Sequence, residues 1–75
     1  MNDVAGGSDN RYSVRETQGD RGWEVEILDP EGRVVSSRAC AADGEARTFA
    51  STVRQHIYWL SEEKFREYYR LDPQA

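Results

Sequence analysis

Hydrophobic and polar residues alternate along two stretches in the first half of the chain. The first stretch begins at Arg11, and its alternating residues are Tyr12 and Val14 on one side and Ser13, Arg15 and Thr17 on the other. The second is GWEVEILDPEGRVVSSRA, from Gly22 to Ala39, which alternates on both sides of Asp-Pro-Glu-Gly. A period of two is typical of half-buried strands, and both QGDRG and DPEG are turn sequences. We therefore predict three antiparallel strands joined by two turns.

The DPEG turn also predicts how the second and third strands pair. Pro30 pre-sets its own φ, Asp29 can accept hydrogen bonds from the backbone, and Gly32 suits a left-handed residue. The register that follows places the apolar side chains on one face and opposite charges on the other. Its facing pairs are Leu28 with Val34, Ile27 with Val35, Val25 with Ser37, Trp23 with Ala39 and, on the polar face, Glu24 with Arg38. The polar face would thus carry Glu24, Glu26, Ser36 and Arg38.

Beyond the third strand the period changes to that of an amphipathic helix. The apolar residues at helical spacing are Ala46, Phe49, Ala50, Val53, Ile57 and Leu60. Asp43 is the predicted N-cap, and Glu45 lies in the first turn, where a negative charge is favourable. Ser61, followed by two glutamates, favours a break and a second short helix over one continuous helix. The predicted fold class is α+β: a three-stranded antiparallel β-sheet (meander) packed on a C-terminal amphipathic helix, with a short helix after it.

Domain boundaries follow from composition. Residues 1–10 are rich in Gly, Asn and Asp and hold few apolar members, so we expect a disordered N-terminal tail. Residues 11–72 would form a single β-β-β-α(-α) domain, since a chain of 75 residues has room for only one. No stretch resembles a signal peptide or reaches the roughly 18 apolar residues of a membrane span. We expect no membrane association.

Charge and cysteine content restrict the classes of partner. The formal net charge is -4, which disfavours nucleic acid and anionic lipid, because phosphate binding depends on clustered Lys and Arg. Cys40 is the single cysteine, so it forms no internal disulfide, and a cytoplasmic location fits best. Without a second cysteine or clustered histidines, the sequence predicts neither a metal site nor a cofactor.

No pattern of catalytic residues stands out. His56 is the single histidine and falls between apolar helix positions, so a structural role is expected in place of general-base chemistry. Cys40 at the end of the third strand is best interpreted as a small buried hydrophobic residue. The carboxylates are dispersed, and no glycine-rich phosphate loop precedes the helix. The sequence therefore predicts a protein that is not an enzyme.

Aromatic residues are concentrated in the last eighteen positions of the chain. They are Tyr58, Trp59, Phe65, Tyr68 and Tyr69. One helix on a small sheet buries a single stripe, and that stripe is already filled by the helix residues above, so aromatic surface is left over. It could enlarge the core, or it could form a protein interface, where Tyr and Trp are enriched. We expect a small protein-interaction module without catalytic activity, whose partner is another protein or, in a homodimer, a second copy.

The stretch from Trp23 to Arg33, WEVEILDPEGR, and the later ARTF from Ala46 resemble two groups of proteins. One is the arm-type DNA-binding domain at the N-terminus of phage integrases, and the other is a set of small uncharacterised bacterial ββα proteins with a Gly-Trp-x-Val strand. The resemblance covers Gly22 to Ile57 and consists of a hairpin turn and a core pattern. The integrase resemblance implies that the open sheet face enters the major groove, with nucleic-acid contacts from Arg15, Arg33 and Arg38. Glu24 and Glu26 on the middle strand would repel phosphate there.

Overall fold

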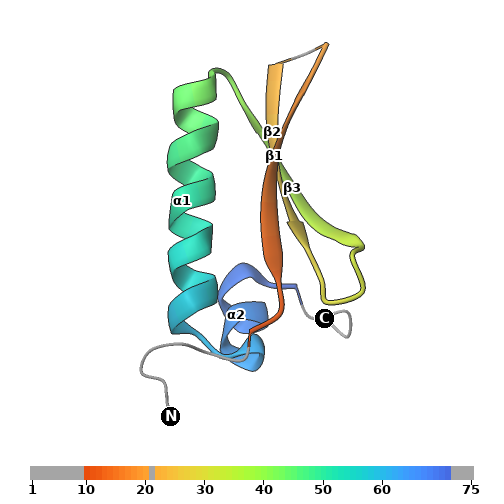
Figure 1. The fold of residues 1–75 in the computed structure, drawn as a ribbon, viewed down its shortest axis with the longest axis vertical. Coiled ribbons are helices and arrows are strands. Elements are labelled where there is room, and N and C mark those ends of the chain that lie inside the picture. Colours follow the sequence, from red (N-terminus) through yellow and green to blue (C-terminus); the bar gives the residue numbers. More distant parts are fainter. Residues whose placement is uncertain (1–9, 21, 72–75) are drawn as a thin grey trace.

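The computed structural model describes residues 10–20 and 22–71, which form a sheet and two helices. The strands are β1 (Ser13–Gly19), β2 (Gly22–Leu28) and β3 (Val34–Cys40), and the helices are α1 (Asp43–Trp59) and α2 (Glu62–Tyr69). In Figure 1, α1 stands along one face of the sheet, and α2 crosses below the end of the sheet where β1 begins. The predicted α+β class and the predicted order of elements are confirmed.

The sheet is an antiparallel meander with β2 in the centre. Between β1 and β2 the register runs from Ser13 opposite Leu28 to Gly19 opposite Gly22. Facing residues share a side of the sheet, so Val14 joins Ile27 on the α1 side. Glu24 and Glu26 of β2 lie on the opposite side of the sheet, away from α1, as predicted. The predicted outer residues of β1 lie on that side too: Ser13, Arg15 and Thr17.

The predicted register of β2 with β3 is correct only at its first pair. Leu28 faces Val34, but the register shifts between Ile27 and Leu28, so that Ile27 faces Ser36 instead of Val35. Val35 is therefore an extra residue, a β-bulge, and every later pair moves by one position. The remaining pairs are Glu26 with Ser37, Val25 with Arg38, Glu24 with Ala39 and Trp23 with Cys40.

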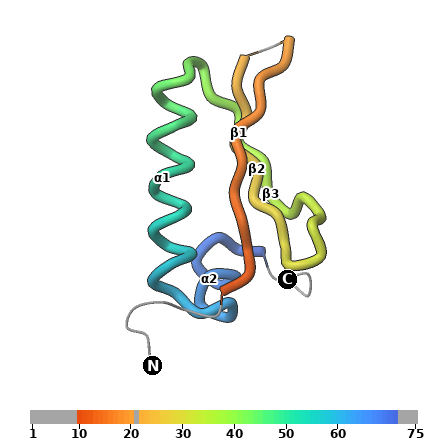
Figure 2. The backbone as a smooth tube through the Cα atoms, in the orientation of Figure 1, coloured from red at the N-terminus to blue at the C-terminus, as the bar shows by residue number. Residues whose placement is uncertain are grey.

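This shift changes the face of each later β3 side chain. Ser36 and Arg38 lie on the α1 side, not on the outer face, so the predicted Glu24–Arg38 pair is wrong. The guanidinium of Arg38 instead lies 4.6 Å from the ring centre of Phe49 on α1. Figure 2 shows the backbone between β2 and β3 curling away from α1 at the end of the sheet that carries the bulge.

The core lies between the sheet and α1. Its first part is formed by Val25, Cys40, Ala46 and Ala50, and its second by Tyr12, Ile27, Val53 and Phe65. Small alanines in the first half of α1 allow the helix to approach the sheet closely. Near Val53 the ring of Phe65 from α2 packs into the same cluster. The second helix is thus a component of the core and not an appendage.

The start of α1 differs from the prediction in its capping. The N-cap residue is Ala42, and Asp43, expected as the cap, is the first helical residue. The carboxylate of Glu45 reaches back and accepts a hydrogen bond from the backbone N–H of Ala41 at 2.9 Å. The N-cap of α1 thus has no side-chain hydrogen bond, and the Asp43 carboxylate instead approaches Arg47 one turn later at 3.5 Å.

The predicted break at Ser61 is confirmed. The Ser61 hydroxyl caps α2 by accepting a hydrogen bond from the backbone N–H of Lys64 at 3.2 Å. The helix ends at Arg70, whose φ of 58° is left-handed, and the Leu71 N–H then bonds the Arg66 carbonyl at 2.8 Å. These caps make α2 a separate element of eight residues.

Asn10 and Arg11, the first described residues, hydrogen-bond to the junction of α1 and α2. The Asn10 amide donates to the Leu60 carbonyl at 3.1 Å, and its oxygen accepts from the Tyr12 N–H at 2.9 Å. Arg11 donates its backbone N–H and its Nε to Glu62, both at 2.8 Å. The remainder of the predicted tail, residues 1–9, lies outside the described residues.

Candidate interaction surface

The five aromatic residues singled out from the sequence are divided between surface and core. Tyr58, Trp59 and Tyr68 are exposed, at 52, 66 and 61% of their surface. Tyr69 is half-buried, and Phe65 is fully buried. The structure therefore shows one of the two alternatives in part: Phe65 and part of Tyr69 enlarge the core, whereas the other three rings remain exposed.

The exposed rings lie near the junction of the two helices, Tyr58 and Trp59 on α1 and Tyr68 on α2. Tyr58 and Trp59, at the end of α1, contact each other edge to face with their centres 5.2 Å apart. Tyr68 on α2 packs on the ring of His56 at 4.5 Å. His56 lies three residues before Trp59, so the two are neighbours on the surface of α1. We call Tyr58, Trp59 and Tyr68 the aromatic surface.

His56 connects the two helices. Its Nδ1 lies 2.6 Å from the hydroxyl of Tyr69, and the two rings pack edge to face. Burial raises the pKa of the Tyr69 phenol, and the nearby Tyr68 adds to that rise. The hydroxyl therefore stays protonated near neutral pH and can donate to the imidazole. The structural role expected for His56 agrees with this geometry.

The three exposed rings together present a considerable apolar area. Aromatic side chains bury 150–250 Å² each when covered, so the exposed portions of these three amount to roughly 400 Å². Contiguous apolar patches of that size on small proteins are often functional. Lys64 lies one turn before Tyr68 on α2 and adds a polar rim.

The outer face of the sheet is mostly polar. Neither described helix covers it (Figure 1). Its best-defined contact is between Arg15 Nε and Glu26 at 2.6 Å across β1 and β2. Glu24 lies beside Ala39 and Thr17 with no salt bridge among the described residues. This face is therefore a solvated surface with an acidic bias.

The three arginines implied as nucleic-acid contacts do not share a face. Arg15 lies on the outer face, and Arg38 lies on the α1 side over the ring of Phe49. Arg33 belongs to the β2–β3 turn, where its Nε donates to Asp29 at 3.1 Å. A strand-face reader of DNA would need these cations on one surface, and the bulge at Val35 separates Arg38 from the other two.

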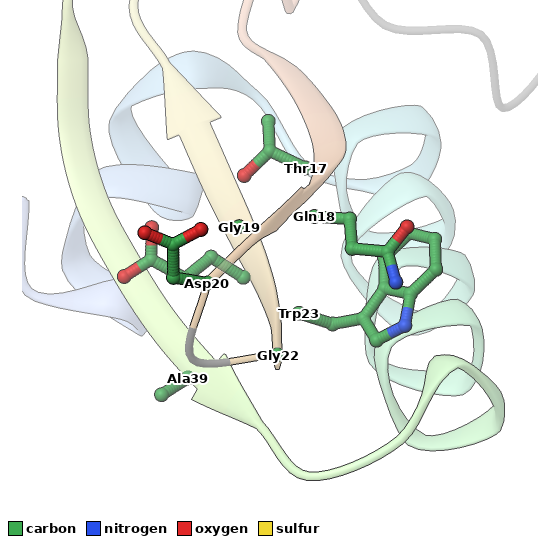
Figure 3. Close-up of a pocket in the computed structure, with 8 residues that line it drawn as sticks. Thr17, Gln18, Gly19, Asp20, Gly22, Trp23 and Ala39 are labelled. Atoms are coloured by element: carbon green, nitrogen blue, oxygen red, sulfur yellow. The ribbon is translucent and has the colours of Figure 1, made fainter.

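Surface hollows formed by the described residues include one at each turn of the sheet. One, of about 360 Å³, lies at the β1–β2 turn, and Figure 3 shows its lining residues. Gln18 and Trp23 point toward α1, whereas Thr17 and Asp20 lie on the other side of the strands (Figure 3). The second, of about 600 Å³, lies between the β2–β3 turn and α2 and is rimmed by salt-bridged arginines.

The single cysteine and the possible metal ligands can also be located in the described part of the chain. Cys40 is buried in the core at 4% exposure, as expected of a structural cysteine. Within residues 10–20 and 22–71, no three His, Cys, Asp or Glu side chains come together in a way that could hold a metal ion. Neither helix in those ranges is long and apolar enough to cross a membrane.

Sequence analysis did not single out Val34 and Val35, which the structure leaves 45% and 37% exposed. The bulge turns Val35 out of the predicted core pairing with Ile27. Neighbouring residues of a strand point to opposite faces, so the sequence implies that one of two adjacent valines is exposed, but it does not indicate the bulge that exposes Val35 as well.

Comparison with protein-family models, curated proteins and solved structures found no match. The resemblance of Gly22 to Ile57 to integrase arm-binding domains and to small bacterial ββα proteins therefore stays a prediction.

Proposed function

We propose that this chain is a protein-interaction module without catalytic activity, which contacts a protein partner through the aromatic surface of Tyr58, Trp59 and Tyr68. The observation that carries this proposal is their exposure beside a well-packed aromatic core. The core has taken Phe65 and part of Tyr69, so the fold itself does not require the outer three rings to be aromatic. Protein interfaces are enriched in such residues.

The size of the aromatic surface indicates the kind of contact. Roughly 400 Å² is about half of what each partner contributes to a standard interface. We therefore expect the rings to be the central anchors of a larger contact, or the whole of a weak one. Self-association through this surface, one of the two forms that the sequence left open, belongs to the weak class and would be observed only at high concentration.

A photoreactive phenylalanine analogue at position 59, irradiated in the cell, tests the proposal. We expect a discrete adduct that disappears when Tyr68→Ala is added. Its mass distinguishes a second copy, at twice the mass of the chain, from a different protein. The matched control is the same analogue at Thr48, which is exposed on the same helix face about 16 Å farther up α1. Equal yields from the two positions, or no adduct from position 59, would refute the proposal.

A further inference from the structure

The hollow between the β2–β3 turn and α2, which we call the α2 hollow, combines apolar and charged lining residues. Its volume of about 600 Å³ is within the range of pockets that hold ligands. Figure 2 shows the turn and the end of α2 at the same end of the molecule. The apolar lining residues are Tyr12, Pro30, Val34, Val35 and Leu71, and the charged ones are Arg11, Asp29, Glu31, Arg33, Glu62 and Arg66.

The bulge in β3 contributes the exposed part of the apolar lining. Val35 is the extra residue of the bulge, and it remains exposed together with Val34 beside it. Both valines line the α2 hollow. Aliphatic surface open to water in this way gains free energy when another apolar group covers it.

Hydrogen bonds hold the walls of the hollow in place. On the turn side, the Asp29 carboxylate accepts from two backbone N–H groups and from Arg33 Nε. On the helix side, the Leu71 N–H bonds the Arg66 carbonyl at 2.8 Å. The hollow is therefore pre-formed, so a ligand does not have to order its walls.

The charges around the hollow are unequally exposed. The side chain of Arg11 is 73% exposed and that of its partner Glu62 21%. The side chain of Arg33 is 76% exposed and that of its partner Asp29 only 9%. Arg11 bonds through Nε and Nη2, and Arg33 bonds Asp29 through Nε, so Nη1 of each guanidinium contacts no described residue. Both arginines thus retain N–H donors that can bind a further carboxylate.

Glu31 indicates where a carboxylate is favourable. Its side chain is 72% exposed and approaches Nη2 of Arg33 at 3.5 Å. The pKa of Arg11 is raised chiefly by its hydrogen bond to Glu62, and the charge of Glu31 adds to that rise. Both arginines therefore attract the same acidic group. A surface ion pair at this distance is weak, so another carboxylate can displace Glu31.

We propose that the α2 hollow binds an extended segment of a partner protein in which an aspartate or glutamate is flanked by aliphatic residues. The carboxylate of the segment displaces Glu31 and accepts hydrogen bonds from Arg11 and Arg33. The aliphatic side chains beside it cover Val34 and Val35.

The charge and shape of the site favour this partner over other anions. The formal net charge of -4 repels a polyanion at long range, whereas a single carboxylate loses little there and gains short-range hydrogen bonds. A segment within a chain has side chains on both sides of its acidic residue, whereas a chain end has them on one. This suits an apolar lining that comes both from β3 and from Leu71 beyond α2.

Two matched peptides test the proposal by nuclear magnetic resonance of the full chain. Acetyl-Gly-Leu-Asp-Leu-Gly-amide carries the carboxylate, and the same peptide with Asn in place of Asp has nearly the same shape without the charge. We expect the acidic peptide to shift the backbone amide signals of Val34, Val35 and Leu71. We expect it to bind about fivefold more tightly than the Asn peptide, as suits two exposed ion pairs, and to lose this advantage at high salt.

Glu31→Gln distinguishes a displaced group from an ordinary binding contact. Removing a competing carboxylate should strengthen binding of the acidic peptide about threefold and leave the Asn peptide unchanged. The matched control is Glu24→Gln, which makes the same change in net charge beside the other hollow. It should leave both affinities unchanged.

Two further variants separate the guanidinium from the apolar lining. Arg11→Gln combined with Glu62→Gln leaves the net charge unchanged, and it should reduce the preference for the acidic peptide to about twofold. Val35→Thr should weaken both peptides by the same factor of about two, because it removes apolar surface and no charge. Circular dichroism verifies that each variant is folded.

Equal affinity for the two peptides, or weaker binding of the acidic peptide to Glu31→Gln, would overturn the proposal. Shifts confined to the aromatic surface would also overturn it. Shifts of Val34 and Val35 that depend on the concentration of the free chain would assign the hollow to a second copy. A gain from Asp72→Asn as large as that from Glu31→Gln would assign it to the chain's own next residues. None of these results changes the adduct expected from position 59, because the residues of the aromatic surface do not line this hollow.

Discussion

Three donors converge on the carboxylate of Asp29 at the turn between β2 and β3. One oxygen accepts the backbone N–H groups of Glu31 and Arg33 at 3.0 and 2.9 Å, and the other accepts Arg33 Nε at 3.1 Å. Chiefly because of the Arg33 backbone bond, the pKa of Asp29 lies below its usual value. Gly32, with φ of 89°, lets the chain complete the turn between these donors. A single carboxylate therefore organises the whole connection.

Because the pKa of Asp29 is lowered in the folded protein, the free energy of unfolding should depend on pH, and Asp29→Asn should weaken that dependence. A folded-state pKa below the unfolded one means that the unfolded chain binds more protons, so this contribution is present above about pH 4 and is lost as the pH falls through the folded pKa. We expect the free energy of unfolding of the two proteins to differ most near neutral pH and to converge in acid. Urea unfolding at about pH 7, 4 and 2.5 measures this.

The control for this comparison is Glu31→Gln, since Glu31 is exposed and approaches Arg33 only at 3.5 Å. Glu62, whose pKa is also lowered, mainly by Arg11, titrates equally in all three proteins and cancels. A constant gap between Asp29→Asn and the unmodified protein at every pH would contradict the assignment.

At the scale of the elements, the sequence predicted the strands and helices, which follow from residue patterns. It missed the β-bulge, which is the insertion of a single residue into β3. Strand alternation, the helical stripe and the Ser61 cap are local signals, and the structure confirms each. The bulge at Val35 is not a local signal, because nothing in VVSS distinguishes an extra residue from a regular strand. The bulge lies where the β2–β3 turn joins the regular part of the strand pair. The extra residue shifts the register by one, so Ser36 and Arg38 lie on the face opposite to the predicted one.

The aromatic segment was predictable in number but not in orientation. Composition alone indicated more rings than one helical stripe could bury. Which of them entered the core depended on the break at Ser61, which rotates α2 so that Phe65 faces Tyr12 at 5.1 Å and Tyr68 faces outward. Sequence periodicity within eight residues is too short to specify that rotation.

Truncating two rings of α2 should separate its structural role from its surface role. Phe65→Ala removes a fully buried ring from the meeting point of both helices and the sheet, and we expect it to cost about 3–5 kcal/mol of stability. Tyr68→Ala, three residues later and 61% exposed, should change stability by only about 0.5 kcal/mol. Urea unfolding monitored by circular dichroism gives both values. Comparable losses for the two variants would mean that Tyr68 belongs to the core.

At the scale of the whole molecule, charge is distributed as separate short-range pairs without a single-sign face. Most arginines of the described residues lie within 4 Å of a carboxylate, and their partners come from different elements. The pairs are Arg11 with Glu62, Arg15 with Glu26, Arg33 with Asp29, Arg47 with Asp43 and Arg54 with Glu16. The chain as a whole carries a formal net charge of -4. The long-range field therefore repels polyanions, although cations are numerous.

This charge distribution predicts that the chain does not bind duplex DNA. Phosphate binding gains affinity from releasing counterions, which requires several cations on one surface, and here Arg15 and Arg38 lie on opposite sides of the sheet. Even at low ionic strength, where the Debye length of about 30 Å lets distant charges act together, the net field is repulsive. We expect no retardation of duplex DNA in a shift assay at about 10 mM salt. Retardation that Arg15→Ala abolishes and Arg47→Ala does not would show that the outer face binds DNA despite Glu24 and Glu26, as the integrase resemblance implies.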